Sequence, residues 1–219
     1  MNAFQPRRPS KLVWLGVYLV VFYTAWSAWA FLLVRHPELN RSALLRAAVR
    51  LGLWVVPALI FVRSVAGPPV LEGLGFSPNL RAGWSIGAIG MAIVLVLFLA
   101  GHRFGTLRLK PLDATAWLNP ILTAPLAEEI VFRGVVFRIL FERLKFWRAA
   151  LASAALFALI HAPYWRLSSD KRGPDLLSAL GSMFGYGLLF AGLFRWSGSL
   201  WSPLLCHWFN NLLNTALVP

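Results

Sequence analysis

The sequence predicts an all-α protein, a polytopic membrane helix bundle with about seven transmembrane helices. Three observations lead to this prediction. The 219 residues are 58% apolar and only 13% charged, whereas charged residues make up roughly 25% of a typical soluble domain. The mean hydropathy is +0.66. The apolar residues also gather into runs close to the roughly 20 residues that a helix needs to cross a bilayer.

The apolar runs divide the chain into seven expected spans, separated by polar gaps that often contain Pro or Gly. The first run is longer than the roughly 7 to 15 apolar residues of a signal-peptide core, so it is interpreted as a span. No separate soluble domain is visible, and residues 1–219 are expected to form a single membrane-embedded domain. The spans are expected at residues 12–34, 43–62, 82–100, 118–140, 148–163, 175–194 and 199–218.

The formal net charge of +13 does not indicate nucleic-acid binding. The basic residues fall mostly in short gaps between apolar runs rather than along one helix face, a distribution typical of loops and interface anchors. Many tryptophans lie near the ends of the expected spans, including Trp14, Trp147 and Trp196. There an amphipathic ring suits the level of the lipid headgroups. We therefore expect the lipid bilayer as a partner and no nucleic acid.

Polar residues inside the expected spans are the candidates for function, because an ionisable group at membrane depth is costly unless it is paired or faces a cavity. Arg46 and Arg50 lie near the N-terminal end of the second span, where snorkelling toward the interface would account for them. The remaining groups need another explanation. They are Glu128, Glu129 and Arg133 in the fourth span, His161 in the fifth, and His207, Asn210, Asn211 and Asn214 in the seventh.

The adjacent residues Glu128 and Glu129 are expected to have different surroundings. Because a helix turns about 100° per residue, Glu129 and Arg133 share a face and can form an i, i+4 ion pair. Glu128 points away from both and is the carboxylate without a local partner, which makes it the candidate general base. Pro120 and Pro125 interrupt the same span, and irregular backbone at membrane depth requires protein or water around it. We therefore expect a cavity near Glu128.

The polar residues of the seventh span lie at i, i+3, i+4 and i+7, so one polar stripe follows the helix and must face protein or water. Hydrogen bonding between helices would also explain this stripe, and a packing role would explain His161 alone. The acidic residues of the fourth span, His161 and the polar stripe of the seventh span are nevertheless expected at the same depth in the membrane. Spans joined by short connections alternate in direction, so the start of the fourth, the end of the fifth and the later part of the seventh lie on the same membrane side.

These residues permit hydrolysis. A carboxylate and a histidine that share a water can activate it for attack on a peptide carbonyl, while histidine and amide donors stabilise the oxyanion. This scheme needs no metal or other cofactor. The alternative is zinc, with Glu128, His161 and His207 as three ligands and an open fourth position, although no His-Glu-x-x-His helix is present. Cys206 is interpreted as a small core residue, because it is turned about 100° away from the neighbouring His207.

Three short motifs lie in order on the fourth, fifth and seventh spans. They are Glu128-Glu129-x-x-x-Arg133, Phe157-x-x-x-His161 and His207-x-x-x-Asn211. Together they resemble the motifs of the CAAX protease and bacteriocin-processing (CPBP, abortive-infection-type) family of intramembrane glutamic endopeptidases, which is related to the type II CAAX prenyl endopeptidases. The resemblance covers about residues 118–215.

The resemblance implies an intramembrane endopeptidase that hydrolyses a peptide bond of a membrane-associated peptide or protein. It implies that Glu128 and His161 activate the water, that His207 and Asn211 hold the oxyanion, and that Glu129 with Arg133 has a supporting part. The expected location is the bacterial inner membrane, with the peptide substrate as a second partner besides lipid. The alternatives are a non-catalytic immunity or peptide-binding protein of the same fold, a zinc-dependent protease, and a proton or ion carrier.

Overall fold

The computed structural model describes residues 10–67, 69–76, 79–101, 107–168 and 171–218. Besides loops and turns, the described part contains helices and one short strand pair, which confirms the predicted all-α class. In chain order the elements are α1 (Lys11–Arg35), the 3₁₀ turn η1 (Pro37–Asn40), α2 (Ala43–Arg50), the π-helical η2 (Leu51–Val55), α3 (Val56–Ala66), α4 (Val70–Leu74), α5 (Leu80–Gly101), β1 (Arg108–Leu109), α6 (Ala114–Ala116), the π-helical η3 (Trp117–Thr123), α7 (Ala124–Glu129), the π-helical η4 (Ile130–Phe137), α8 (Arg138–Phe141), α9 (Phe146–Leu159), α10 (Ala162–Ser168), α11 (Gly173–Ser197), α12 (Trp201–Ala216) and β2 (Leu217–Val218).

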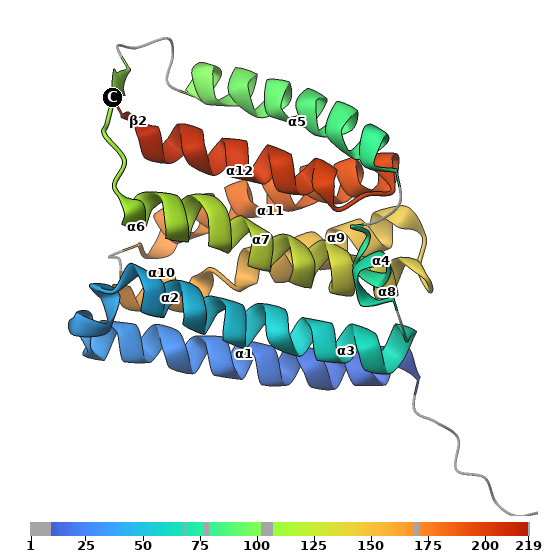
Figure 1. The fold of residues 1–219 in the computed structure, drawn as a ribbon. Coiled ribbons are helices and arrows are strands. Elements are labelled where there is room, and N and C mark those ends of the chain that lie inside the picture. The colour runs from blue at the N-terminus through green and yellow to red at the C-terminus, as the bar shows by residue number, and fades with distance from the viewer. Residues whose placement is uncertain (1–9, 68, 77–78, 102–106, 169–170, 219) are drawn as a thin grey trace, which may run out of the picture.

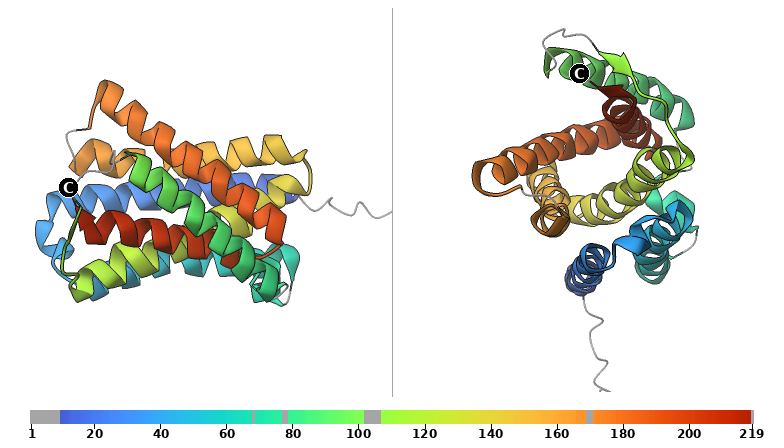
Figure 2. Two further views of the ribbon diagram at one scale, coloured as in Figure 1. Left: turned by 90° about the horizontal axis from the view of Figure 1, so that it is seen from above. Right: turned by 90° about the vertical axis from the view of Figure 1, so that its left-hand side faces the viewer.

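The helices form a bundle whose members run along one common direction, and successive long segments point in opposite directions (Figure 1). Seen end on in the right-hand view of Figure 2, α1 and the α2–α3 segment lie at one edge and α5 at the other. The segment from α6 to α8 lies between them, together with α9, α11 and α12. Strands β1 and β2 pair antiparallel, with Arg108 opposite Val218, and so connect the segment before α6 to the end of α12.

Five helices of the described chain are long and apolar enough to cross a membrane. The other two expected spans are also helical, over α6–α8 and α12, but they carry the polar motifs and do not meet the same criteria of length and composition. The integral membrane character is therefore confirmed, while the count of seven spans stays a prediction. The five helices are Lys11–Arg35, Ala43–Val65, Leu80–Gly101, Phe146–Leu167 and Gly173–Ser197.

The fourth expected span is a continuous helical segment with two π-helical turns, η3 and η4, on either side of α7. In η3 the Ala124 N–H donates to the Asn119 carbonyl, five residues earlier. The same register would place the Pro120 carbonyl opposite the nitrogen of Pro125, which has no hydrogen to donate. The two prolines therefore leave a backbone acceptor that another helix can use, and the predicted irregularity of this span is confirmed.

The core of the bundle lies around η4, whose eight residues are all buried. Small residues let the surrounding helices approach closely, as is usual in membrane bundles. A Cβ on Gly90 of α5 would stand 3.1 Å from the Cβ of Cys206 in α12, and a Cβ on Gly187 of α11 would stand 2.9 Å from the Cα of Ala154 in α9. Cys206 is fully buried, as expected of a core residue.

We predict that Gly187→Ala destabilises the protein, because the added Cβ would meet the backbone of Ala154, which cannot rotate away. Overpacking of this kind lowers the free energy of unfolding by about 1–3 kcal/mol. Gly185→Ala in the same helix is the matched control, since a Cβ there has no neighbour within 4 Å. Thermal unfolding in detergent compares the two variants, and equal midpoints would contradict the close α9–α11 contact.

Candidate active site

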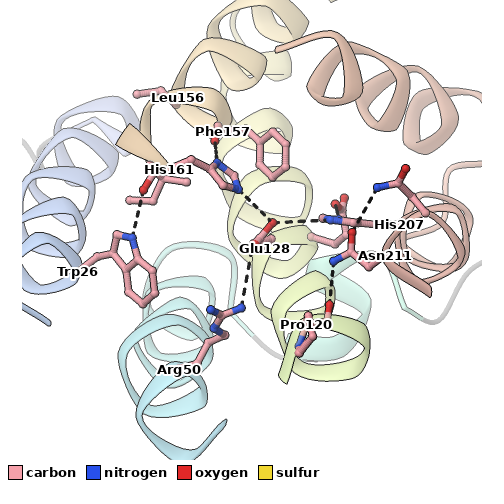
Figure 3. A network of polar contacts seen from close by, with 12 residues as sticks. Trp26, Arg50, Pro120, Glu128, Leu156, Phe157, His161, His207 and Asn211 are labelled. Carbon is pink, nitrogen blue, oxygen red and sulfur yellow. Dashed lines mark hydrogen bonds and ion pairs between the residues drawn. The ribbon is translucent and has the colours of Figure 1, made fainter. Parts of the chain in front are cut away.

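Glu128 lies at the centre of a cluster of ionisable side chains from four segments of the bundle (Figure 3). Its Oε2 is 3.9 Å from Nε2 of His161 and 3.7 Å from Nε2 of His207. Its Oε1 is 3.9 Å from Nη1 of Arg50. The structure thus brings together the three polar groups that share one predicted depth. Polar atoms at such separations can be joined by a water molecule that hydrogen-bonds to both.

Glu129 lies about 100° further around the helix than Glu128 and is fully buried. Its Oε1 accepts a hydrogen bond of 3.1 Å from Nη1 of Arg133, which confirms the ion pair expected from the i, i+4 spacing. The same oxygen accepts a second hydrogen bond of 2.8 Å from Nδ1 of His207. The sequence did not predict this contact. Glu129 therefore orients the imidazole of His207 so that its Nε2 faces Glu128.

Arg133 is also fully buried, and its two terminal nitrogens and the faces of its guanidinium meet groups that stabilise a cation, whereas its Nε is buried without a hydrogen-bond partner. Besides the bond to Glu129, Nη2 donates to the Gly187 carbonyl of α11 at 3.2 Å. The guanidinium lies over the rings of Phe157 and Phe190, 4.5 Å and 5.0 Å from their centroids, a favourable arrangement for a cation. The arginine thus joins η4 to α9 and α11 around the site.

His161 lies in the turn between α9 and α10. Its Nδ1 is 2.9 Å from the Phe157 carbonyl, one helical turn earlier. A carbonyl only accepts hydrogen bonds, so Nδ1 must carry the hydrogen and Nε2 is the atom that faces Glu128. The Trp26 indole of α1 donates to the Ile160 carbonyl at 3.1 Å and so holds this turn in place.

Asn211 supplies the donor that the Pro120 carbonyl lacks within its own helix. Its Nδ2 donates to that carbonyl at 2.7 Å, and its Oδ1 accepts from Nδ2 of Asn210 at 3.2 Å. An amide nitrogen carries two hydrogens, so a second donor remains for a ligand. Asn214 instead donates to the Asn210 carbonyl at 2.8 Å within α12, which fits the structural role considered for the polar stripe.

Two cavities meet at Glu128, His161 and Trp165. The larger, of about 190 Å³, lies toward α9, α11 and α12, and is also lined by Phe157, Met183, Tyr186, Phe190, His207, Asn210 and Asn211. The smaller, of about 130 Å³, lies toward α1, α2 and η3, and is also lined by Trp26, Trp29, Leu33, Arg46, Arg50, Trp54, Asn119, Ile160 and Tyr164. The expected cavity near Glu128 is therefore confirmed.

Arg50 is the site residue that the sequence interpretation missed. Snorkelling toward the interface is the wrong description of this side chain, because its guanidinium points into the bundle, beside Glu128 and 5.6 Å from the Trp26 ring centroid. The sequence feature that could have indicated an inward-facing Arg50 is its spacing of one helical turn from Arg46. This spacing puts two cations on one face of an otherwise apolar helix.

The expectation that hydrolysis here needs no metal or other cofactor stays a prediction. Glu128, His161 and His207 are the three residues that the zinc alternative names, and they do lie together. Within the described ranges, however, no group of three or more His, Cys, Asp or Glu side chains is placed so that it could hold a metal ion.

The fold and the site define the class of protein: an integral membrane protein that places a glutamate and two histidines beside two cavities. Residues 110–213 match the family model described as type II CAAX prenyl endopeptidase, Rce1-like. Over these residues, just under half of the chain, the protein is similar to that family of endopeptidases. The match confirms the family resemblance of the three motifs, all of which fall inside it.

Two relatives align over most of the chain. One is the protein named "Putative membrane peptidase YdiL" of Bacillus subtilis (strain 168), 29% identical over 189 residues, which cover 76% of this chain and 70% of that protein. The other is an "Uncharacterized 24.3 kDa protein" of Escherichia coli, 29% identical over 164 residues, which cover 68% of each chain. No solved structure matches the chain.

We predict that Arg133→Leu lowers the free energy of unfolding by about 3–5 kcal/mol, because the change leaves the Glu129 carboxylate buried without its cationic partner. Arg195→Leu is the control: this arginine is exposed and packs over the Phe141 ring, so its loss is expected to cost at most about 1 kcal/mol. Chemical unfolding in detergent measures both. Similar losses for the two variants would show that the buried ion pair contributes no more to the free energy of unfolding than an exposed arginine does.

Proposed function

We propose that the protein is an intramembrane endopeptidase that hydrolyses a peptide bond of a membrane-associated peptide or protein with a water activated by Glu128 and His161. The observation that supports this proposal most directly is the approach of the two imidazole Nε2 atoms to one carboxylate oxygen of Glu128 at the border of two cavities. The match of residues 110–213 to the family model of type II CAAX prenyl endopeptidases agrees with it.

In the proposed reaction, a water held between Glu128 and His161 attacks the peptide carbonyl carbon. The proton of the water passes to Glu128 or to Nε2 of His161, which has a free lone pair when the ring is neutral. When the carbon–nitrogen bond breaks, the same proton passes to the leaving amine. The products are a carboxylic acid and an amine, and the two residues return to their starting states.

The oxyanion would be stabilised by Asn211 and His207 from α12. Asn211 has one N–H beyond the one that it donates to Pro120. His207 donates Nδ1–H to Glu129, so its Nε2 can donate to an oxyanion only when the ring carries both protons, as imidazolium. Glu129 and Arg133 would act as positioning residues, because they touch His207 and the surrounding backbone rather than the reacting atoms.

We predict that Glu128→Gln and His161→Ala each lower the rate of cleavage by about 10²–10⁴-fold, the usual contribution of a positioned general base. Controls are Glu142→Gln and His36→Ala, which change an exposed glutamate and an exposed histidine outside the site. The substrate is found by comparing membrane peptide ends from cells that carry native or Glu128→Gln protein. Identical profiles would rule against a peptidase, and a protective phenotype that survives Glu128→Gln would favour the non-catalytic alternative.

The same cleavage assay, run with purified protein in liposomes, separates the metal-free mechanism from its zinc alternative. The proposal predicts that a chelator leaves the rate unchanged. Loss of cleavage on chelation that zinc restores would replace the water-activation scheme by a zinc site on the same residues.

We also predict that Asn211→Ala lowers kcat by about 10²–10³-fold, as expected for the loss of one oxyanion donor. Asn214→Ala is the control, because among the described residues the hydrogen bonds of this exposed amide lie within α12. Since Asn211 also holds the Pro120 carbonyl, the unfolding midpoint of each variant is measured beside its kcat. A full kcat in a folded Asn211→Ala protein would remove this residue from the oxyanion site.

A further inference from the structure

Arg50 lies beside the proposed base, yet the water-activation scheme gives it no part. Its side chain is 24% exposed and lines the smaller cavity. Nη1 lies 3.9 Å from Oε1 of Glu128, and Figure 3 shows the guanidinium pointing toward this carboxylate. The separation is too long for a direct hydrogen bond, but opposite charges at this distance attract strongly where little water separates them. Arg50 is therefore a candidate for a role in the reaction.

The two histidines beside Glu128 do not supply a lasting positive charge. A neutral imidazole carries one N–H. His161 directs its N–H to the Phe157 carbonyl, and His207 directs its own to Glu129. Each Nε2 atom then faces Oε2 of Glu128 with a lone pair, which offers the carboxylate neither a hydrogen nor a charge. A protonated ring would offer both, but a residue that exchanges protons during the reaction cannot keep a constant charge.

Arg50 is the permanent cation of this cluster, because a guanidinium stays protonated in proteins. In the part of the chain that the structure describes, the side chains that pair with Glu128 at 3.7–3.9 Å are those of Arg50, His161 and His207. Glu128 must be ionised to accept a proton from water, and an ionised carboxylate inside a membrane protein is costly unless an opposite charge accompanies it. Arg50 brings that charge from the side of Oε1, while Oε2 faces the histidines.

The position of Arg50 is fixed by the same side chain that fixes the His161 turn. The guanidinium lies 5.6 Å from the Trp26 ring centroid, within the range of a cation–π interaction. The Trp26 indole donates to the Ile160 carbonyl at 3.1 Å, and its ring packs edge to face against the buried Trp54, 4.9 Å between centroids. Arg50 also directly precedes the π-helical turn η2, and such turns are frequent at functional sites. Helix α1 thus sets the cation and the histidine relative to each other.

We infer that Arg50 is a positioning residue that compensates the charge of Glu128 and holds its carboxylate so that Oε2 stays directed at the histidines and the water. This inference rests on the proposed peptidase function. It adds to the site a residue that lies outside the range 110–213 of the family match. Arg50 would act through Glu128 and would not contact the peptide. The proton transfers stay as proposed, because the guanidinium neither gains nor loses a proton.

The test first removes the guanidinium by Arg50→Ala and Arg50→Gln. The proteins are assayed in liposomes with the fastest-cleaved member of a set of mixed-sequence decapeptides, and cleavage is measured by mass spectrometry. We expect kcat to fall by about 10- to 100-fold in both variants, as the loss of one contact to a charged group allows. KM should stay nearly unchanged, because Arg50 does not touch the peptide. Arg50→Lys keeps the charge and should retain more activity than either variant.

The guanidinium is then returned from solution to the Arg50→Ala protein. Urea is the matched control compound, since it has nearly the same planar shape and no charge. We expect millimolar guanidinium to raise kcat several-fold and urea at the same concentration to leave it unchanged. Neither compound should change kcat of Arg63→Ala, whose exposed arginine lies on α3, the continuation of the same helix. The rate of Glu128→Gln should not respond either, because the partner of the cation is missing.

A native kcat in the folded Arg50→Ala and Arg50→Gln proteins would overturn the inference. A raised KM at unchanged kcat would also overturn it, since Arg50 would then act on the peptide, and so would equal rescue by urea, since filling the cavity would then suffice.

If the native protein cleaves no peptide, the peptidase proposal fails, and unfolding midpoints decide the pairing of Arg50 with Glu128 separately. The pairing is supported if guanidinium raises the midpoint of Arg50→Ala but not that of the double variant Arg50→Ala/Glu128→Gln, while urea raises neither. Equal midpoint changes in the two proteins would overturn it.

Discussion

The buried ion pair of Glu129 and Arg133 is the interaction on which the rest of the site depends. Water cannot reach either charge, so each must keep its partners within the bundle. Arg133 reaches the α11 backbone at Gly187, and Glu129 reaches His207 on α12. The positions of α11 and α12 relative to η4 are thereby constrained, and the ring of His207 is turned toward Glu128 as a consequence.

Two adjacent glutamates have separate roles because a helix turns by about 100° between them. Glu129 has no exposed surface, and one of its oxygens already accepts two hydrogen bonds. Glu128 faces the two cavities, and the ionisable groups around it stand 3.7–3.9 Å away rather than at hydrogen-bond distance. The Glu129 carboxylate thus holds neighbouring helices together, while the Glu128 carboxylate remains available to a water and a substrate.

The irregular backbone before Glu128 has a related effect. Pro125 has no N–H, so the carbonyl of Pro120 accepts from Asn211 on α12 instead of from its own helix. Trp208 adds a second bond to this segment, from its indole to the Leu122 carbonyl at 3.0 Å. A local defect in one helix therefore sets the position of the amide that is proposed to hold the oxyanion.

The sequence alone determined the all-α membrane class, the three motifs, the Glu129–Arg133 pair and the irregular backbone at the two prolines. Each of these follows from composition, from helical periodicity or from the chemistry of neighbouring residues. Only the tertiary structure decided that His207, 78 residues away along the chain, bonds to Glu129, and that Arg50 points inward to Glu128. Those contacts depend on which face each helix turns toward its neighbours. An apolar pattern leaves that choice open, because lipid and protein interior are both apolar and only the packing of small residues and buried charges distinguishes them.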